Sequence, residues 1–172
     1  YVLDIFVVAL ALPRMQGTFS AAPDQVSWVA TAFVLGTTVM IIASGWLSTR
    51  VGTRLLLIVS IASFMVLSLL AANAETLEEE VLWRFLMGVA GAPIQPMCQV
   101  VILNTYPREE HGWALAIWGL GVMSAPVVAL PLAGVIIDLV GWPGVFYMNM
   151  PVAGLALLGT FLFVPGTRVK GR

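Results

Sequence analysis

The sequence predicts an all-α integral membrane protein: a bundle of six membrane-spanning helices that form two inverted three-helix repeats. Of the 172 residues, 60% are hydrophobic and 10% are charged, whereas a soluble domain is about 25% charged. The mean hydropathy is +0.98. Apolar runs alternate with short polar links, and most of the runs approach the roughly 20 residues that a spanning helix needs. The runs fall into two triplets, and in each triplet the first run carries a charge and the second is rich in glycine.

The first three apolar runs are residues 1–13, 26–47 and 55–72. The first run is shorter than the roughly 20 residues of a span, so we expect the chain to begin inside its first helix. Residues 14–25 read as a polar link. The second run is rich in Gly, Ala, Thr and Ser, which is typical of contact between helices, and the third is rich in the Leu, Ile and Val of a lipid-facing helix.

The last three apolar runs are residues 81–103, 113–137 and 145–164. Pro93 and Pro96 remove backbone hydrogen bonds from the fourth run, so we expect that helix to be kinked or locally open. The fifth run also holds several glycines and prolines and is expected to bend. Four glutamates in residues 73–80 suit an outer loop or a helix start, where acidic groups are favoured by the helix dipole. Residues 138–144 are expected to form another outer link.

The basic residues set the expected orientation of the spans. Cytoplasmic links carry an excess of Lys and Arg. With both ends of the chain inside, six basic residues lie on the cytoplasmic side and Arg14 lies alone outside. The six are Arg50, Arg54, Arg108, Arg168, Lys170 and Arg172. The sequence therefore predicts that both ends face the cytoplasm.

Composition also excludes several classes of function. A net charge of −1 gives no reason to expect nucleic-acid binding. Cys98 is the single cysteine, which excludes an intrachain disulfide and a Cys-rich metal site. His111 is the single histidine and lies among charged residues of a link, and no hydrolase or phosphate-binding motif is present. We expect no enzyme activity, no metal and no cofactor.

Two charged residues, Asp4 and Arg84, fall within the apolar runs. A charge at the centre of a bilayer costs at least ~2.5–3.5 kcal/mol, so it usually faces a cavity or a partner. Asp4 precedes Arg14 by ten residues, about 15 Å of helix, and Arg84 follows Glu80 by about 6 Å. Both residues then lie in the outer half or near the middle, where they could meet or share an aqueous cavity. The alternative is that Arg84 extends to the outer surface and Asp4 lies at an exposed end.

Short motifs occur along the chain in a familiar order. They are Leu3-Asp4 to Pro13, Gln25 to Leu35, Gly45-x-x-x-Thr49-Arg50-x-Gly52-Thr53-Arg54, Arg84-x-x-Met87-Gly88-x-x-Gly91-Ala92, Ala125-Pro126 to Gly134, and Trp142 to Pro151. Together they resemble the amino-terminal half of a major facilitator superfamily transporter, most similar to the fourteen-helix drug/proton antiporter branch. Thr49 stands where the family's loop motif has Asp, and Met87 where its fourth-helix motif has Gln.

The resemblance implies half of a major facilitator fold in the bacterial inner membrane, and export of drug-like or amphipathic organic compounds in exchange for protons by alternating access. It implies that Asp4 carries the proton, that Arg84 biases its protonation, and that the link with Thr49 acts as a cytoplasmic gate. Candidate residues of a substrate cavity are Trp28, Phe33, Met87 and Trp118. We read the chain as a fragment whose carboxy-terminal transmembrane half is missing. The alternatives are a carrier of a metabolite or sugar, and a non-transporting membrane scaffold or remnant.

Overall fold

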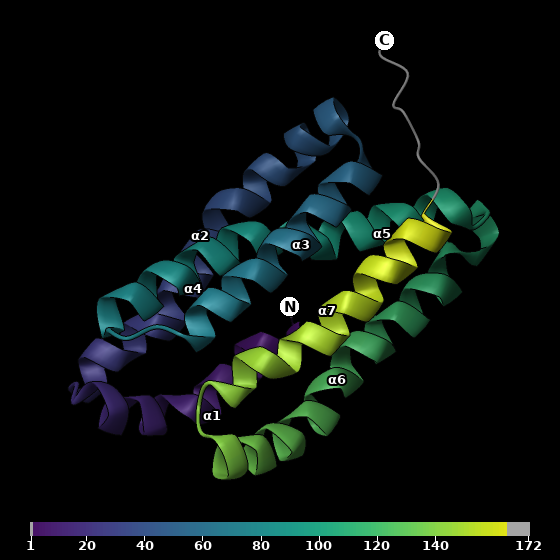
Figure 1. The fold of residues 1–172 in the computed structure, drawn as a ribbon. Helices are drawn as coiled ribbons and strands as arrows, with labels where there is room; N and C mark the ends of the chain where they lie inside the picture. Colours follow the sequence, from purple (N-terminus) through teal and green to yellow (C-terminus); the bar gives the residue numbers. More distant parts are fainter. Residues whose placement is uncertain (1, 165–172) are drawn as a thin grey trace.

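The computed structural model describes residues 2–164, which form seven α-helices and one short 3-10 helix and contain no strand (Figure 1). In order they are α1 (Val2–Phe19), α2 (Pro23–Val51), α3 (Thr53–Ala72), α4 (Leu77–Gly91), α5 (Ile94–Thr105), η1 (Arg108–Glu110), α6 (His111–Val140) and α7 (Gly144–Phe163). Six segments are long and apolar enough to cross a membrane, with α4 and α5 together making the fourth. The predicted fold class is confirmed.

Several of the predicted links are shorter than the sequence indicated, and two of them show why. The polar link expected at 14–25 is reduced to residues 20–22, because α1 continues through Pro13 and Arg14 to Phe19. Its last turns are held by tertiary contacts: Met15 is fully buried, and the Trp142 indole donates a hydrogen bond to the Thr18 hydroxyl at 3.1 Å. At the other link, α6 continues to Val140, so the link expected at 138–144 is residues 141–143. The polar residues at these positions therefore do not end either helix.

The fourth span is interrupted, as its prolines predicted. Helix α4 ends at Gly91, Ala92 and Pro93 separate the two segments, and α5 begins at Ile94. A proline at this point has no N–H to donate to the carbonyl four residues earlier, and its ring crowds that carbonyl. In α6, by contrast, Pro126 and Pro131 lie inside one continuous helix of 30 residues.

The helices pack in pairs that follow the expected internal symmetry. Helix α2 packs on α4, α6 on α1, and α3 on α7; Figure 1 also shows α6 running beside α7. Exchange of the first three spans with the last three maps α1 onto α4–α5, α2 onto α6, and α3 onto α7. It therefore maps the α2–α4 pair onto the α6–α1 pair and the α3–α7 pair onto itself. These three pairs agree with two inverted three-helix repeats, whereas the close packing of α3 on α4 is matched only by a weaker contact between α7 and α1.

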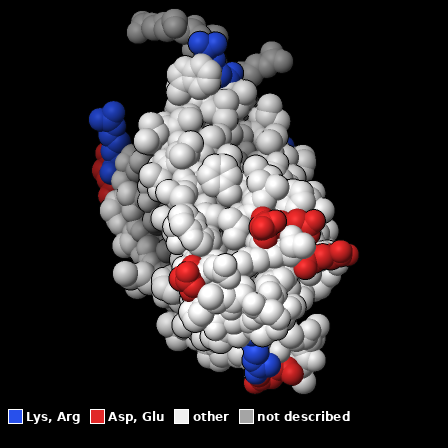
Figure 2. All heavy atoms as spheres, turned by 90° about the vertical axis from the view of Figure 1, so that its left-hand side faces the viewer, with Lys and Arg blue, Asp and Glu red and all other residues white. Residues whose placement is uncertain are grey.

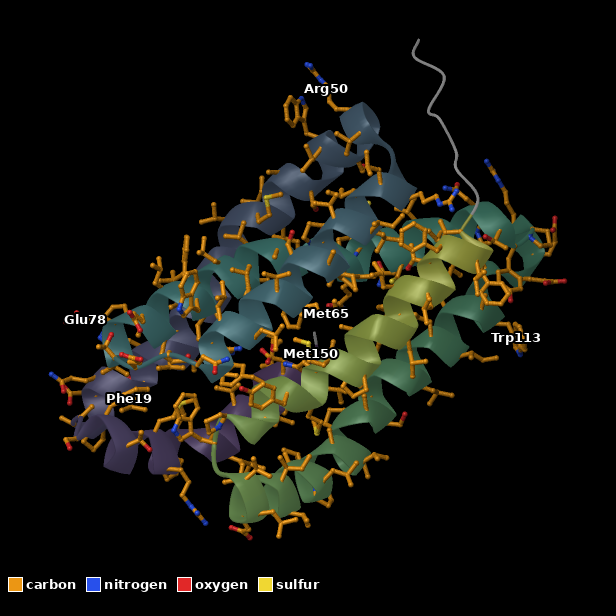
Figure 3. All side chains as sticks on the ribbon, in the orientation of Figure 1. Phe19, Arg50, Met65, Glu78, Trp113 and Met150 are labelled. Carbon is orange, nitrogen blue, oxygen red and sulfur yellow. The ribbon has the colours of Figure 1, made fainter. Side chains whose placement is uncertain are left out.

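The two ends of the bundle are distinct. Phe19 and Glu78 lie at one end, Arg50 and Trp113 lie at the other, and Met65 and Met150 lie between them (Figure 3). Figure 2 faces the end with Phe19 and Glu78 and shows acidic side chains gathered on a surface that is otherwise mostly uncharged. The hydroxyl of Thr76 accepts a hydrogen bond from the amide of Glu79 at 3.2 Å and so caps the start of α4 at this end.

Helices α2 and α4 cross in direct backbone contact. A Cβ atom placed on Gly88 would lie 3.0 Å from both the carbonyl carbon of Phe33 and the nitrogen of Thr37, and closer still to the oxygen of Phe33. In the same way, a Cβ atom placed on Gly36 of α2 would lie 3.1 Å from the carbonyl carbon of Phe85 in α4. Only glycine at both positions allows this approach. The crossing fixes Phe33 of α2 against the inner face of α4, where the charged residues lie.

Candidate functional site

Asp4 and Arg84 form an ion pair in the interior of the bundle. The Nη1 of Arg84 on α4 donates to the Oδ2 of Asp4 on α1 at 2.5 Å, and each residue is 1% exposed. Of the two arrangements that the sequence allowed, a direct contact and a shared aqueous cavity, the structure has the direct contact. The alternative, in which Arg84 extends to the outer surface, is wrong because the crossing of α2 and α4 brings other side chains over it. Charge-assisted contacts of this length are among the strong hydrogen bonds of proteins.

The second oxygen of Asp4 is held by α7. The Nδ2 of Asn149 donates to the Oδ1 of Asp4 at 2.9 Å and also contacts the hydroxyl of Ser68 on α3 at 3.3 Å. Ser68 in turn donates to the backbone carbonyl of Phe146 at 3.0 Å. Asp4 therefore joins three helices, α1, α4 and α7, and a fourth through Ser68. The carboxylate of Asp4 is thus part of a buried polar network that links these four helices.

Two aromatic rings complete the surroundings of Arg84. Its guanidinium carbon lies 4.3 Å from the ring centroid of Phe33 on α2 and 5.8 Å from that of Phe146 on α7. A desolvated cation over an aromatic face is stabilised by up to about 2 kcal/mol. The rings thus hold the guanidinium in place while excluding water from the ion pair.

Sequence analysis missed three residues of this site: Ser68, Asn149 and Glu80. Asn149 belongs to the motif that ends at Pro151, and its polar side chain in an apolar run was the available signal. Glu80 belongs to the residues expected in an outer loop or at a helix start, and it does lie in the first turn of α4. It is nevertheless 0% exposed, and both of its carboxyl oxygens lack a hydrogen-bond partner among the described residues. Its position four residues before Arg84 places the two on one face of α4.

The predicted gate link lies at the opposite end from the acidic cluster. Gly52, with φ +87°, is the single residue between α2 and α3, and this left-handed backbone favours glycine. Arg50 lies over the ring of Trp46, and Arg54 donates to the carbonyl of Phe161 in α7 at 3.0 Å. Gly45 is exposed.

Thr49, the residue that replaces the family's Asp, bonds within its own helix. Its exposed hydroxyl donates to the carbonyl of Trp46 at 2.7 Å. A neutral hydroxyl makes a weaker contact than a carboxylate would. The hydrogen bond from this motif to another helix comes instead from Arg54, which joins α3 to α7.

The two glycine-rich motifs have different surroundings. In the fourth-helix motif Gly88 lies at the α2 crossing, and Gly91 is the last residue of α4. In the fifth-helix motif Ala125, Pro126 and Gly134 are half-buried, and nothing lies within 4 Å of a Cβ placed on Gly134. The fully packed positions of α6 are instead Ala129 and Ala133, which belong to the same core cluster as α1.

The four candidate cavity residues do not come together. Trp28 is 56% exposed and lines a hollow of about 640 Å³ near the start of α4, with Phe19 and Val81. Trp118 lines a separate hollow of about 400 Å³ beside α5 and α7. Phe33 and Met87 are buried in the core. Within residues 2–164 no group of three His, Cys, Asp or Glu side chains could hold a metal ion.

The sequence model described as Major Facilitator Superfamily matches residues 1–172. "Multidrug export protein EmrB" of Haemophilus influenzae is 35% identical over 157 residues, which cover 91% of this chain and 31% of that protein. "Putative multidrug resistance protein MdtD" of Yersinia pestis is 32% identical over 170 residues, 99% of this chain and 37% of that protein. The chain spans about a third of the length of these relatives.

Proposed function

We propose that this chain, which belongs to the Major Facilitator Superfamily, is the amino-terminal six-helix bundle of an exporter that exchanges drug-like or amphipathic organic compounds for protons. Membership of the family makes the protein an integral membrane transporter. The names of the two relatives support multidrug export. Because the chain spans about a third of their length, a second six-helix bundle would complete the substrate path between the two halves.

The buried ion pair is the observation that carries the proposal. Ionisable residues inside a membrane protein are expensive and usually mark a functional site. Asp4 is paired with Arg84 and is surrounded by side chains from α1, α3, α4 and α7. A carboxylate in that position changes the balance between helices whenever it gains or loses a proton.

The size of that change is suited to alternating access. Breaking a buried ion pair by neutralising one partner costs about 3–5 kcal/mol. Moving a two-state equilibrium from 1:99 to 99:1 needs about 5.5 kcal/mol. Protonation of Asp4 would therefore shift most of the population from one arrangement of α1 against α4 to another. Substrate binding that favours the unprotonated arrangement would expel the proton. Substrate movement in one direction would then be coupled to proton movement in the other.

The remaining residues take supporting roles in this proposal. Arg84 biases the protonation of Asp4. Gly36 and Gly88, at the α2–α4 crossing, hold Arg84 at its depth in the bundle. The link with Gly45, Thr49, Arg50, Gly52 and Arg54 acts as the cytoplasmic gate, with the Arg54–Phe161 contact as its latch. Trp28 and Trp118, which line hollows, contact substrate, while Phe33 and Met87 form the wall behind the ion pair.

The charge asymmetry supports the proposed orientation. The end with Arg50 and Arg54 faces the cytoplasm, and the acidic end with Glu75, Glu78 and Glu79 faces outward (Figure 2). Both ends of the chain are then cytoplasmic. The membrane is the bacterial inner membrane, since the two relatives come from bacteria.

The test uses the complete protein in liposomes that hold a pH-sensitive dye and an acidic interior. A permanently charged amphipathic cation is added, because such a compound cannot carry protons by itself. We expect the interior to become alkaline faster with the protein than in protein-free liposomes. The proposal fails if no amphipathic cation changes the internal pH, or if a sugar is taken up with no pH change.

A further inference from the structure

Glu80 is the buried group that the proposed function leaves unused. It lies one turn outward of Arg84 on α4, about 6 Å along the helix axis. It is 0% exposed, and neither carboxyl oxygen has a hydrogen-bond partner among the described residues. The Nε of Arg84 is also buried without such a partner. The two unsatisfied groups therefore lie on one face of the same helix, in the order Glu then Arg that favours pairing.

A count of buried charges shows what Glu80 can do. Among the described residues, the buried charged side chains are Asp4 on α1 and Glu80 and Arg84 on α4. Helices α2 and α3 pack against α4, and none of their buried side chains among the described residues is charged. One cation faces two acids, so an ionised Glu80 would be a second, uncompensated negative charge. Such a group is neutral when buried.

We propose that Glu80 is a second proton-binding carboxyl, on the outer side of the ion pair, which receives the proton first and passes it to Asp4. The inference rests on the proposed proton exchange. In the transfer the O–H bond of Glu80 breaks and an O–H bond forms on the Oδ2 of Asp4. The guanidinium of Arg84 releases Asp4 and pairs with the new carboxylate of Glu80.

This step keeps the buried charge balanced. Before it, the three groups are a neutral Glu80, an ionised Asp4 and a cationic Arg84; after it, the two acids have exchanged states. The net charge is zero both times, so no uncompensated charge is buried. Since Glu80 lies nearer the outward end, the transfer moves the proton inward, the direction that would drive export.

The experiment is infrared spectroscopy of the complete protein at neutral pH, where a protonated carboxyl gives a carbonyl band distinct from that of a carboxylate. We compare the wild type with Glu80→Gln and with Glu79→Gln, a matched control in the same turn that removes an exposed carboxylate and keeps an acceptor for the Glu75 amide. We expect a protonated-carboxyl band in the wild type and Glu79→Gln, and none in Glu80→Gln. Proton-driven transport should slow roughly tenfold, about 1.4 kcal/mol, in Glu80→Gln alone.

If Glu80→Gln does not fold, the wild type is labelled with isotope-substituted glutamate instead. The protonated-carboxyl band must then shift, because it is assigned to a glutamate. The inference is overturned if the band is absent from the wild type, persists in Glu80→Gln, or is unmoved by the label. It is also overturned if Glu80→Gln transports at the rate of Glu79→Gln. Failure of the proposed function is separate: the wild type would then exchange no protons for substrate, whatever its spectrum.

Discussion

Substitution of Gly88 by alanine tests the backbone contact that positions the site. The added Cβ would lie 3.0 Å from the carbonyl carbon of Phe33 and the nitrogen of Thr37 and closer to the oxygen of Phe33, where ordinary contacts begin near 3.4 Å. None of these atoms belongs to a flexible side chain, so α2 and α4 must separate. Overpacking of this kind costs about 1–3 kcal/mol.

Separation of α2 from α4 also affects the surroundings of the Asp4–Arg84 ion pair. Phe33 lies 4.3 Å from the guanidinium of Arg84, so moving α2 outward weakens that cation–π contact as well. The assay is thermal unfolding of the purified protein in detergent. Because each kcal/mol of stability corresponds to about 2–4 °C of Tm, we expect the Tm of Gly88→Ala to fall by several degrees.

Gly154→Ala in α7 is the matched control for Gly88→Ala. Nothing lies within 4 Å of a Cβ placed on Gly154, and alanine is favoured over glycine inside a helix by roughly 0.5–1 kcal/mol. We expect this variant to be as stable as the wild type or slightly more so. If Gly88→Ala matched Gly154→Ala in Tm, helices α2 and α4 would not cross in backbone contact, and the packing described here would be refuted.

Two further predictions contrast the buried and the exposed ion pair. Arg84→Gln removes the cation and should destabilise the bundle by about 3–5 kcal/mol, because Asp4 is left buried without its charge partner; a Tm within a degree of wild type would contradict this. The Arg14–Asp138 pair has the same kind of contact, at 2.7 Å, but its side chains are 57% and 70% exposed. Arg14→Gln should therefore change stability by less than about 1 kcal/mol, and a loss comparable with that of Arg84→Gln would show that burial does not decide the value of these pairs.

Much of the fold could be predicted because it depends on local chemistry. Span positions follow from bilayer thickness, and the break in the fourth span was expected from its prolines, although Pro126 and Pro131 lie inside the unbroken α6. The meeting of Asp4 and Arg84 could also be predicted, since two charges at similar depth in an apolar bundle have few other partners. The span positions and the break need no knowledge of which helices are neighbours, whereas the contact of Asp4 with Arg84 also requires α1 and α4 to lie together.

The parts that could not be predicted depend on neighbours in space. Helix α1 continues past Arg14 because Met15 is buried and Thr18 accepts a hydrogen bond from Trp142. Glu80 reads as an outer glutamate like Glu78 and Glu79, and only the packing of other helices over its face of α4 buries it. Polarity along the chain carries no information on such tertiary contacts.

The most direct test of the central claim is proton-driven transport by Asp4→Asn in the complete protein. The substitution keeps the shape and an oxygen for the Asn149 contact but removes the charge that pairs with Arg84. Asp24→Asn, which changes an exposed carboxylate in the first turn of α2, is the matched control. We predict that Asp4→Asn loses accumulation driven by a pH gradient while Asp24→Asn retains it. If Asp4→Asn drove accumulation at the wild-type rate, Asp4 would not be the proton-coupling residue.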